Sequence, residues 1–169
     1  MTAFLVGLAL IGSGPALTPN LPHFDFKGVK PTDTRAMHEA SINKCDRYFQ
    51  ADGCTLKDGK VAGVSVNPRF MFADDGSGLR RIRGDFIGTN YPVLLASFKA
   101  KWGEPTRETE TTVQNGYGAT LRIPEATWEF VEGVMIITGP GFKGWGNIHY
   151  KSRAVMAAED EAAKPKVDF

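Results

Sequence analysis

Segments in which hydrophobic and polar residues alternate make up much of this chain, and turn-forming residues separate them. Side chains on a β-strand point alternately to its two faces, so the pattern predicts half-buried strands. We expect strands over residues 60–66, 69–73, 79–86, 108–114, 117–123, 127–131, 134–138 and 147–152. In the third of these, Arg81 and Arg83 point away from the face that carries Ile82 and Phe86.

Two segments have helical spacing instead. One helix is predicted to follow Asn90, because Pro92 suits a first helical turn and Gly103 is a typical residue after a last turn. Its apolar stripe consists of Leu94, Leu95, Phe98 and Trp102. Another helix is predicted over residues 33–44, with a weaker apolar stripe. That stripe consists of Ala36, Met37 and Ala40.

Short turns between the strands predict antiparallel pairing. Asp58-Gly59 suits a type I′ turn, whose two central residues need positive φ, and Asn115-Gly116 marks another hairpin. Strand runs joined by hairpins, with only two good helices, indicate an α+β fold. We expect an antiparallel sheet of about six to seven strands with two main helices packed on one face.

The N-terminal residues 1–18 are typical of a signal peptide. An apolar run over residues 3–12 is followed by small residues up to Ala16, and this run is too short to span a membrane. No Lys or Arg precedes the run, so a buried N-terminal strand or helix is the alternative. A periplasmic or secreted location follows from the first interpretation.

The rest of the chain is expected to form one α+β domain over residues 19–152, followed by a weakly ordered tail over 153–169. Within the tail, residues 154–163 have helical propensity but a weak apolar face. The order of helices and strands suggests an αβββ pseudo-repeat over residues 24–86 and 90–152.

Cys45 and Cys54 are the two cysteines of the chain, and their spacing predicts a local disulfide. Disulfides persist in oxidising compartments, so the pair also supports export. We expect the bond to join the end of the first helix to the start of the first strand. A paired thiol is neither a free nucleophile nor a metal ligand, and His23, His38 and His149 show no metal-ligand spacing.

Composition and charge argue against several functions. The net charge is +1, so the chain lacks the basic excess of a general nucleic-acid binder. The glycines of residues 139–144 match the spacing of a dinucleotide loop, but a strand-like segment follows where that motif needs a helix. No arrangement of nucleophile, base or paired carboxylates is apparent, so the sequence predicts no cofactor and assigns no catalytic residue.

Two groups of residues are candidates for binding. Phe142, Lys143 and Trp145 lie among four glycines, where large side chains can be presented to a partner. The alternative is a bent connection that packs both aromatics into the core. The second group is a basic cluster, in which Arg81 and Arg83 are the candidates for binding. The alternative interpretation is that these charges belong to a solvated sheet edge and bind no partner. This cluster comprises Arg80, Arg81, Arg83, Lys99, Lys101 and Arg107.

Four features of the chain together resemble a known type of protein. They are residues 26–29 (FKGV) before the first predicted helix, the turn closed by the predicted disulfide, the antiparallel strands, and a second helix that ends with residues 102–105 (WGEP). The chain is similar to small exported bacterial α+β proteins such as β-lactamase inhibitor protein and the SmpA/OmlA outer-membrane lipoproteins. The chain departs from this type in two ways. In those proteins a Gly-Met-Thr often begins the first helix, whereas this chain has residues 30–32 (KPT), and it lacks their lipid-bearing cysteine. The resemblance implies helices packed on an antiparallel sheet whose exposed face binds another protein.

Together these observations predict an exported, non-catalytic binding domain that contacts a protein or a cell-envelope component. Two alternatives remain open: a small envelope hydrolase that uses surface carboxylates, and a structural component of an assembly. A deep polar cleft with two converging carboxylates would favour the hydrolase, and a stable oligomer would favour the assembly component.

Overall fold

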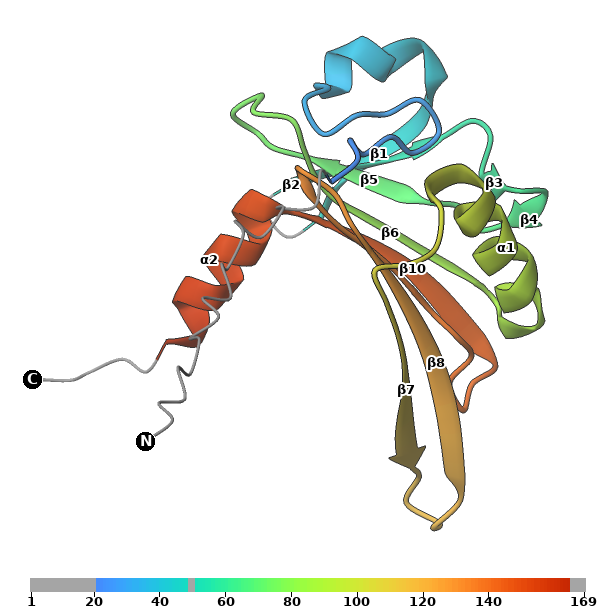
Figure 1. The fold of residues 1–169 in the computed structure, drawn as a ribbon. Coiled ribbons are helices and arrows are strands. Elements are labelled where there is room, and N and C mark those ends of the chain that lie inside the picture. Colours follow the sequence, from blue (N-terminus) through green and yellow to red (C-terminus); the bar gives the residue numbers. More distant parts are fainter. Residues whose placement is uncertain (1–20, 49–50, 165–169) are drawn as a thin grey trace, which may run out of the picture.

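One twisted antiparallel sheet organises the fold, with its strands in the order β1-β2-β5-β6-β10-β9-β8-β7 (Figure 1). This computed structural model describes residues 21–48 and 51–164, so the predicted signal peptide lies outside the described residues. The strands are β1 (Ile42–Tyr48), β2 (Ala51–Leu56), β3 (Lys60–Val61), β4 (Val64–Ser65), β5 (Arg69–Phe72), β6 (Leu79–Ile87), β7 (Arg107–Gln114), β8 (Thr120–Glu129), β9 (Gly133–Thr138) and β10 (Trp145–Ser152). The helical segments are η1 (Arg35–Ser41), η2 (Gly88–Asn90), α1 (Tyr91–Trp102) and α2 (Arg153–Ala163).

The sheet consists of two four-stranded meanders that meet in its centre. The first runs β1-β2-β5-β6 and the second runs β7-β8-β9-β10, and antiparallel pairing of β6 with β10 joins them. Each meander is followed in the sequence by an α-helix, but α1 and α2 lie on opposite sides of the sheet (Figure 1). The strand order is thus symmetric while the placement of the helices is not, and a duplication stays a prediction.

The α+β character of the chain is confirmed, but the number of strands and the arrangement of the helices are corrected. Eight strands form the sheet described here, rather than about six to seven, and a separate β3–β4 hairpin adds a second small sheet. Of the α-helices that the structure describes, α1 is the one that packs on the face where two helices were expected (Figure 1). Its Leu94 and Phe98 are buried in the core, as the apolar stripe predicts.

The prediction of a helix over residues 33–44 is wrong. Residues Arg35–Ser41 form the 3-10 helix η1, and the chain then enters β1. No residue of η1 is buried, and a short helix without a packed apolar face is marginal in water. The Asp33 carboxylate accepts the N–H of Lys30 (2.8 Å) and lies 2.8 Å from Nε2 of His38, so it folds the chain back before the helix.

The Cys45–Cys54 disulfide is confirmed, but its structural role differs from the prediction. The two residues lie directly opposite each other in the β1–β2 hairpin, with their Cα atoms 4.1 Å apart. The bond therefore joins two neighbouring strands at the edge of the sheet, not a helix end to a strand. Cys54 is fully buried, so the bond also ties this edge to the core.

One predicted strand and one predicted turn differ from the structure by a few residues. The strand expected over 60–66 is divided into β3 and β4 by a tight turn at Ala62 and Gly63, whose φ angles are 50° and 78°. These positive values suit a type I′ turn, so the turn lies here and not at Asp58-Gly59. The Asp58 carboxylate instead accepts hydrogen bonds from the N–H of Lys60 (3.0 Å) and from Nζ of Lys27 (2.8 Å).

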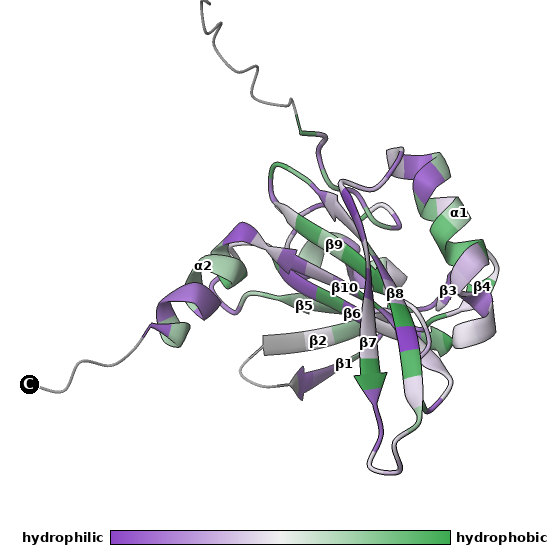
Figure 2. Cartoon of the chain, turned by 60° about the horizontal axis from the view of Figure 1, so that its bottom comes forward, coloured by the Kyte–Doolittle hydropathy of each residue, from purple (hydrophilic) through white to green (hydrophobic). Residues whose placement is uncertain are grey.

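The strands expected over 117–123 and 127–131 are one long strand, β8, which passes through Pro124. Proline has no N–H to donate, but its carbonyl oxygen accepts the N–H of Gly139 at 2.7 Å. The β7–β8 hairpin predicted at Asn115-Gly116 is present, and the Asn115 side chain accepts the N–H groups of Tyr117 and Ala119 at its tip. Figures 1 and 2 show this hairpin extending past the other strands.

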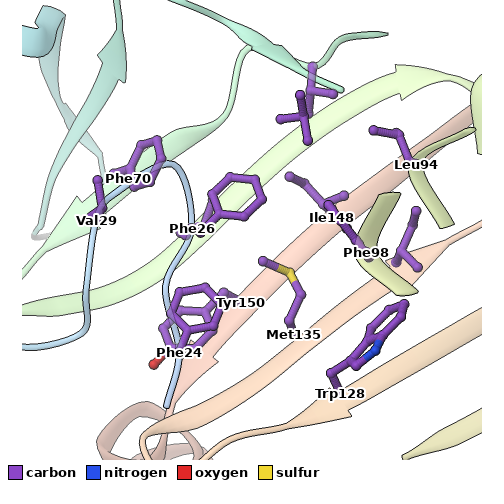
Figure 3. Packing of buried hydrophobic residues seen from close by; sticks show 14 of the residues in the cluster. Phe24, Phe26, Val29, Phe70, Leu94, Phe98, Trp128, Met135, Ile148 and Tyr150 are labelled. Atoms are coloured by element: carbon purple, nitrogen blue, oxygen red, sulfur yellow. The ribbon is translucent and has the colours of Figure 1, made fainter. Parts of the chain in front are cut away.

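An aromatic cluster fills the space between α1 and the sheet, and the N-terminal segment closes it (Figure 3). The Phe24 ring stacks on that of Tyr150 from β10, with 4.0 Å between ring centroids. Phe26 meets the ring of Phe98 from α1 edge-on at 6.1 Å. Residues that precede the first strand are therefore part of the main core. The opposite face of the sheet carries the candidate site.

Candidate binding site on the open face of the sheet

The face of the sheet turned away from α1 is called the open face here. On β6 this face presents the odd-numbered residues from Arg81 to Ile87, because the even-numbered residues Ile82, Gly84 and Phe86 are buried toward the core. Arg81 and Arg83 thus point away from Ile82 and Phe86, as the alternation predicts. Their neighbours on β10 are set by antiparallel register: Lys151 pairs with Arg81, and His149 with Arg83.

A hollow of about 640 Å³ lies on this face across β5, β6 and β10, and it is called the open-face hollow. Its volume falls in the range typical of small-molecule sites, roughly 300–1,000 Å³. Its polar and aromatic lining consists of Asn67, Arg69, Arg83, Asp85, Trp145, Asn147 and His149. The first of these comes from the connection between β4 and β5, and the others come from the three strands.

The sheet register arranges these side chains in three neighbouring rows. Arg69, Arg83 and His149 are directly paired across β5, β6 and β10, so two arginines and an imidazole form one row. Asp85 pairs with Asn147 in the next row. Trp145 pairs with Ile87 in the last row, and both side chains are more than half exposed, at 55% and 56%. The hollow is therefore basic at one end and apolar at the other.

His149 is held neutral at the basic end of the hollow. Burial, followed by the positive charges of Arg83, Lys151 and Arg81, lowers the pKa of His149 from 6.5 to about 4. Among the described residues, no hydrogen-bond partner reaches its buried Nε2 atom. A protonated imidazole would lie opposite Arg83 of β6 and beside Lys151 of its own strand, so the ring is uncharged at neutral pH.

Acidification is expected to destabilise the protein through His149. In the unfolded chain the imidazole takes up a proton below pH 6.5, whereas in the folded chain it does so only near its pKa of about 4. The unfolded state therefore binds more protons in this window, and the free energy of unfolding falls as the pH falls through it. After allowance for solvent screening of a partly exposed ring, we expect a loss of about 1–2 kcal/mol.

The measurement is urea unfolding of the wild-type protein and of His149→Gln between pH 7 and pH 4. The variant cannot titrate at this position, so the wild type should lose about 1–2 kcal/mol more than the variant over this range. Equal losses in both proteins would show that His149 does not carry the effect.

Arg81 is part of a different arrangement on the same face. Glu159 of α2 accepts hydrogen bonds from Arg81 Nη2 and Lys151 Nζ, each at 2.7 Å. The hydrogen bond from Lys151, then that from Arg81, lowers the pKa of Glu159 to about 2. Helix α2 begins at the capping residue Ser152, whose hydroxyl accepts the N–H of Val155 at 3.4 Å. The segment expected to be a weakly ordered tail thus contributes a carboxylate to the sheet.

The structure brings some of the predicted binding residues together and separates others. Trp145 and Arg83 line the same hollow, whereas Arg81 is held by Glu159. Phe142 and Lys143 lie on the exposed loop between β9 and β10 and do not line the hollow. Phe142 is 48% exposed, so neither aromatic of this glycine-rich region packs into the core.

The basic cluster expected from the sequence does not form. Lys99 and Lys101 belong to α1, which covers the opposite face of the sheet. Lys99 Nζ lies 2.8 Å from Glu104 and 2.7 Å from Glu108, and Lys101 Nζ lies 2.7 Å from Asp25. These lysines are therefore paired locally and add nothing to the charge of the open face.

Sequence reasoning missed several side chains of the hollow, and most of them share one origin. All but Asn67 come from strands whose pairing joins distant parts of the chain, so adjacency in the sequence does not reveal them. The signal that could have found these four is the alternation itself, because each occupies a position on the open side of its strand, whereas Asn67 lies in the β4–β5 connection. The missed residues are Asn67, Arg69, Asp85, Asn147 and His149.

The described residues contain no group of three or more His, Cys, Asp or Glu side chains placed to hold a metal ion. Nor do they include a helix with the length and apolar character that crossing a membrane requires. Comparison of the chain with protein-family profiles, with curated proteins and with solved structures found no match.

Proposed function

We propose that this protein is an exported binding domain that holds a protein or cell-envelope component at the open-face hollow. The observation that carries the proposal is the joint exposure of Trp145 and Arg83 in one concave site. Tryptophan and arginine are the residue types that most often dominate binding energy at interfaces. The resemblance to exported proteins that bind through an exposed sheet face supports the same proposal.

Export is supported by the disulfide between Cys45 and Cys54. Such bonds are rare in reducing compartments, and this one is built into the edge of the sheet. The signal-like pattern of residues 1–18 points the same way. These two features support the proposal of a periplasmic or secreted location.

Binding is favoured over hydrolysis by the lining of the hollow. Of the residues that the structure describes, Asp85 is the one carboxylate in this lining, and a glycosidase needs two that flank the bond to be cleaved. Arginine and neutral amide groups dominate instead, and these orient a ligand without supplying an acid and a base. The arrangement suits recognition.

Replacing Trp145 with alanine is expected to weaken retention of the protein on isolated cell-envelope fractions at least about tenfold. The indole is more than half exposed, so its loss removes contact area with a partner and little core packing. The thermal midpoint should fall by less than about 2 °C. Co-sedimentation with envelope fractions measures the retention, and a thermal unfolding scan measures the thermal midpoint.

The matched control is Tyr117→Ala, which removes another exposed aromatic ring at the tip of the β7–β8 hairpin. This variant should bind like the wild type. Equal weakening by both variants would indicate nonspecific adhesion, and unchanged retention of Trp145→Ala would contradict the proposal. A large drop in the thermal midpoint would instead assign Trp145 to the core. A stable oligomer in solution would favour the alternative function, that of a structural component of an assembly.

A further inference from the structure

We propose that the open-face hollow binds a phosphocholine-type group, in which a short chain joins a phosphodiester anion to a quaternary ammonium cation. This inference rests on the proposed function, because it names the ligand of the same site. It follows from two opposite charges that face the hollow without neutralising each other, and from the indole that lies beside one of them.

Arg83 and Asp85 supply the two charges. They lie two positions apart on β6, both are exposed on the open face, and both line the hollow. Within the part of the chain that the structure describes, no hydrogen bond or ion pair joins their side chains to each other or to a third group. Arg69 already has an interaction partner, so its charge is not counted as available. His149, opposite Arg83 on β10, is neutral.

A ligand with charge of a single sign fits this pair poorly. An isolated anion at Arg83 would lie near the Asp85 carboxylate, and an isolated cation at Asp85 would lie near the Arg83 guanidinium, so one of the two side chains would repel it. A zwitterion satisfies both side chains, and its net charge of zero matches that of the pair. Because their Cα atoms are about 7 Å apart along the strand, ligand charges separated by several bonds fit better than two charges on one carbon atom.

Trp145 favours a quaternary ammonium as the cation. Its partner across the sheet is Ile87, two residues beyond Asp85, so Trp145 and Asp85 are diagonal neighbours on the open face. Diagonal neighbours of an antiparallel pair are within reach of an aromatic side chain. The indole is 55% exposed, and the face of an indole attracts a cation that also offers apolar methyl groups. A carboxylate beside an exposed indole therefore suits a trimethylammonium group.

The remaining polar side chains favour a phosphodiester as the anion. The Arg83 guanidinium can donate two parallel hydrogen bonds to it. Asn147 is the diagonal neighbour of Arg83 on β10, and Asn67 lines the hollow from the β4–β5 connection. Each carboxamide has N–H groups to donate, and the charged oxygens of a phosphodiester can accept from several donors at once. The donors thus gather around Arg83, on the side of the hollow away from Trp145.

The test is a titration followed by the indole N–H signals in two-dimensional NMR. The chain has three tryptophans, and Trp102 and Trp128 are packed in the core, so the Trp145 signal reports on the hollow. The probes are glycerophosphocholine, which carries both charges, and two half-ligands, choline and dimethyl phosphate. Glycerophosphocholine should shift the Trp145 signal saturably and bind at least about tenfold more tightly than either half-ligand.

Two neutralising variants test the charges separately. Arg83→Gln should weaken binding of glycerophosphocholine and dimethyl phosphate about tenfold without weakening that of choline. Asp85→Asn should weaken binding of glycerophosphocholine and choline about tenfold without weakening that of dimethyl phosphate. The matched control is Lys143→Gln, which removes an exposed cation from the neighbouring loop outside the hollow and should bind all three probes like the wild type. A circular dichroism spectrum and thermal scan establish that each variant is folded.

Vesicles of phosphatidylcholine distinguish the two sources of this chemistry. Retention on the vesicles, with competition by glycerophosphocholine, would assign the group to a lipid headgroup. Binding of glycerophosphocholine without retention on the vesicles would assign it to a soluble or glycan-linked phosphocholine. Both results support the inference, because the recognised group is the same.

Equal affinity for glycerophosphocholine and for either half-ligand would overturn the inference, as would equal weakening by Lys143→Gln. Tighter binding of glycine betaine, or of a peptide that carries lysine and aspartate, would also overturn it. If Trp145→Ala reduces envelope retention but glycerophosphocholine does not shift the Trp145 signal, the ligand class is wrong and the proposed binding function stands. If retention is unchanged as well, the proposed function fails too.

Discussion

Replacing Phe24 with alanine is expected to lower the free energy of unfolding by about 3–5 kcal/mol. The ring is 2% exposed and lies in the aromatic cluster of the core. It stacks on Tyr150 at 4.0 Å and meets Phe130 edge-on at 5.1 Å between ring centroids. Deleting it leaves a cavity between rings that come from distant parts of the chain, and such rings cannot collapse together readily.

Urea unfolding monitored by circular dichroism measures this loss. Tyr117→Ala serves as the control, because it deletes a ring that is 99% exposed and should change stability by less than about 0.5 kcal/mol. A loss below about 1 kcal/mol in Phe24→Ala would show that the N-terminal segment is dispensable for the core. The segment would then be an appendage rather than a part of the folded unit.

Reducing the Cys45–Cys54 disulfide is expected to lower the free energy of unfolding by about 2–3 kcal/mol. The two cysteines are nine positions apart, and the bond closes a short loop in the unfolded chain. Its loss lets the unfolded chain gain entropy, and β1, an edge strand of the described sheet, loses the covalent link to its neighbour β2. We expect β1 to lose protection from hydrogen exchange before the central strands do.

Unfolding in urea with and without a reductant measures the effect, and Cys45→Ala/Cys54→Ala controls for other actions of the reductant. The double variant should unfold identically in both conditions. If reduction left the wild type unchanged, the hairpin would already persist in the unfolded chain. Two reactive thiols in the native oxidised protein would contradict the bond itself and weaken the case for export.

The helix α1 shows what the sequence can predict well. Pro92 in its first turn and Gly103 after its last residue are local signals, and its apolar stripe faces the core as expected. Gly103 adopts φ = 83°, which a residue without a Cβ atom reaches at little cost. The central strands were predictable for a similar reason, because alternation is visible within a few residues.

The failures concern elements whose structure depends on distant partners. Residues 33–44 have helical spacing, yet the cross-strand bond at Cys45 and the pairing of β1 with β2 make the end of this segment a strand. Pro124 suggests a break, but its carbonyl group is used by Gly139 and the strand continues. In both cases tertiary pairing outweighs local preference.

The candidate site was predictable only in part. Trp145, Arg81 and Arg83 could be singled out by residue type and alternation, but the register of β6 with β10 decides which of them share a hollow. That register joins residues more than 60 positions apart in the printed sequence, such as Arg83 and His149. No short motif encodes it, so the hollow was visible only in the structure.

The central position of β10 constrains the order in which the chain can fold. This strand is the last of the sheet in the sequence, yet it lies between β6 and β9. Until it arrives, a growing chain holds two half-sheets with unpaired inner edges, and the Phe24 ring lacks its stacking partner Tyr150. Unpaired strand edges invite association with other chains. The inner edge of the first meander, β1-β2-β5-β6, therefore stays exposed to such association until β10 pairs with β6 and completes the sheet.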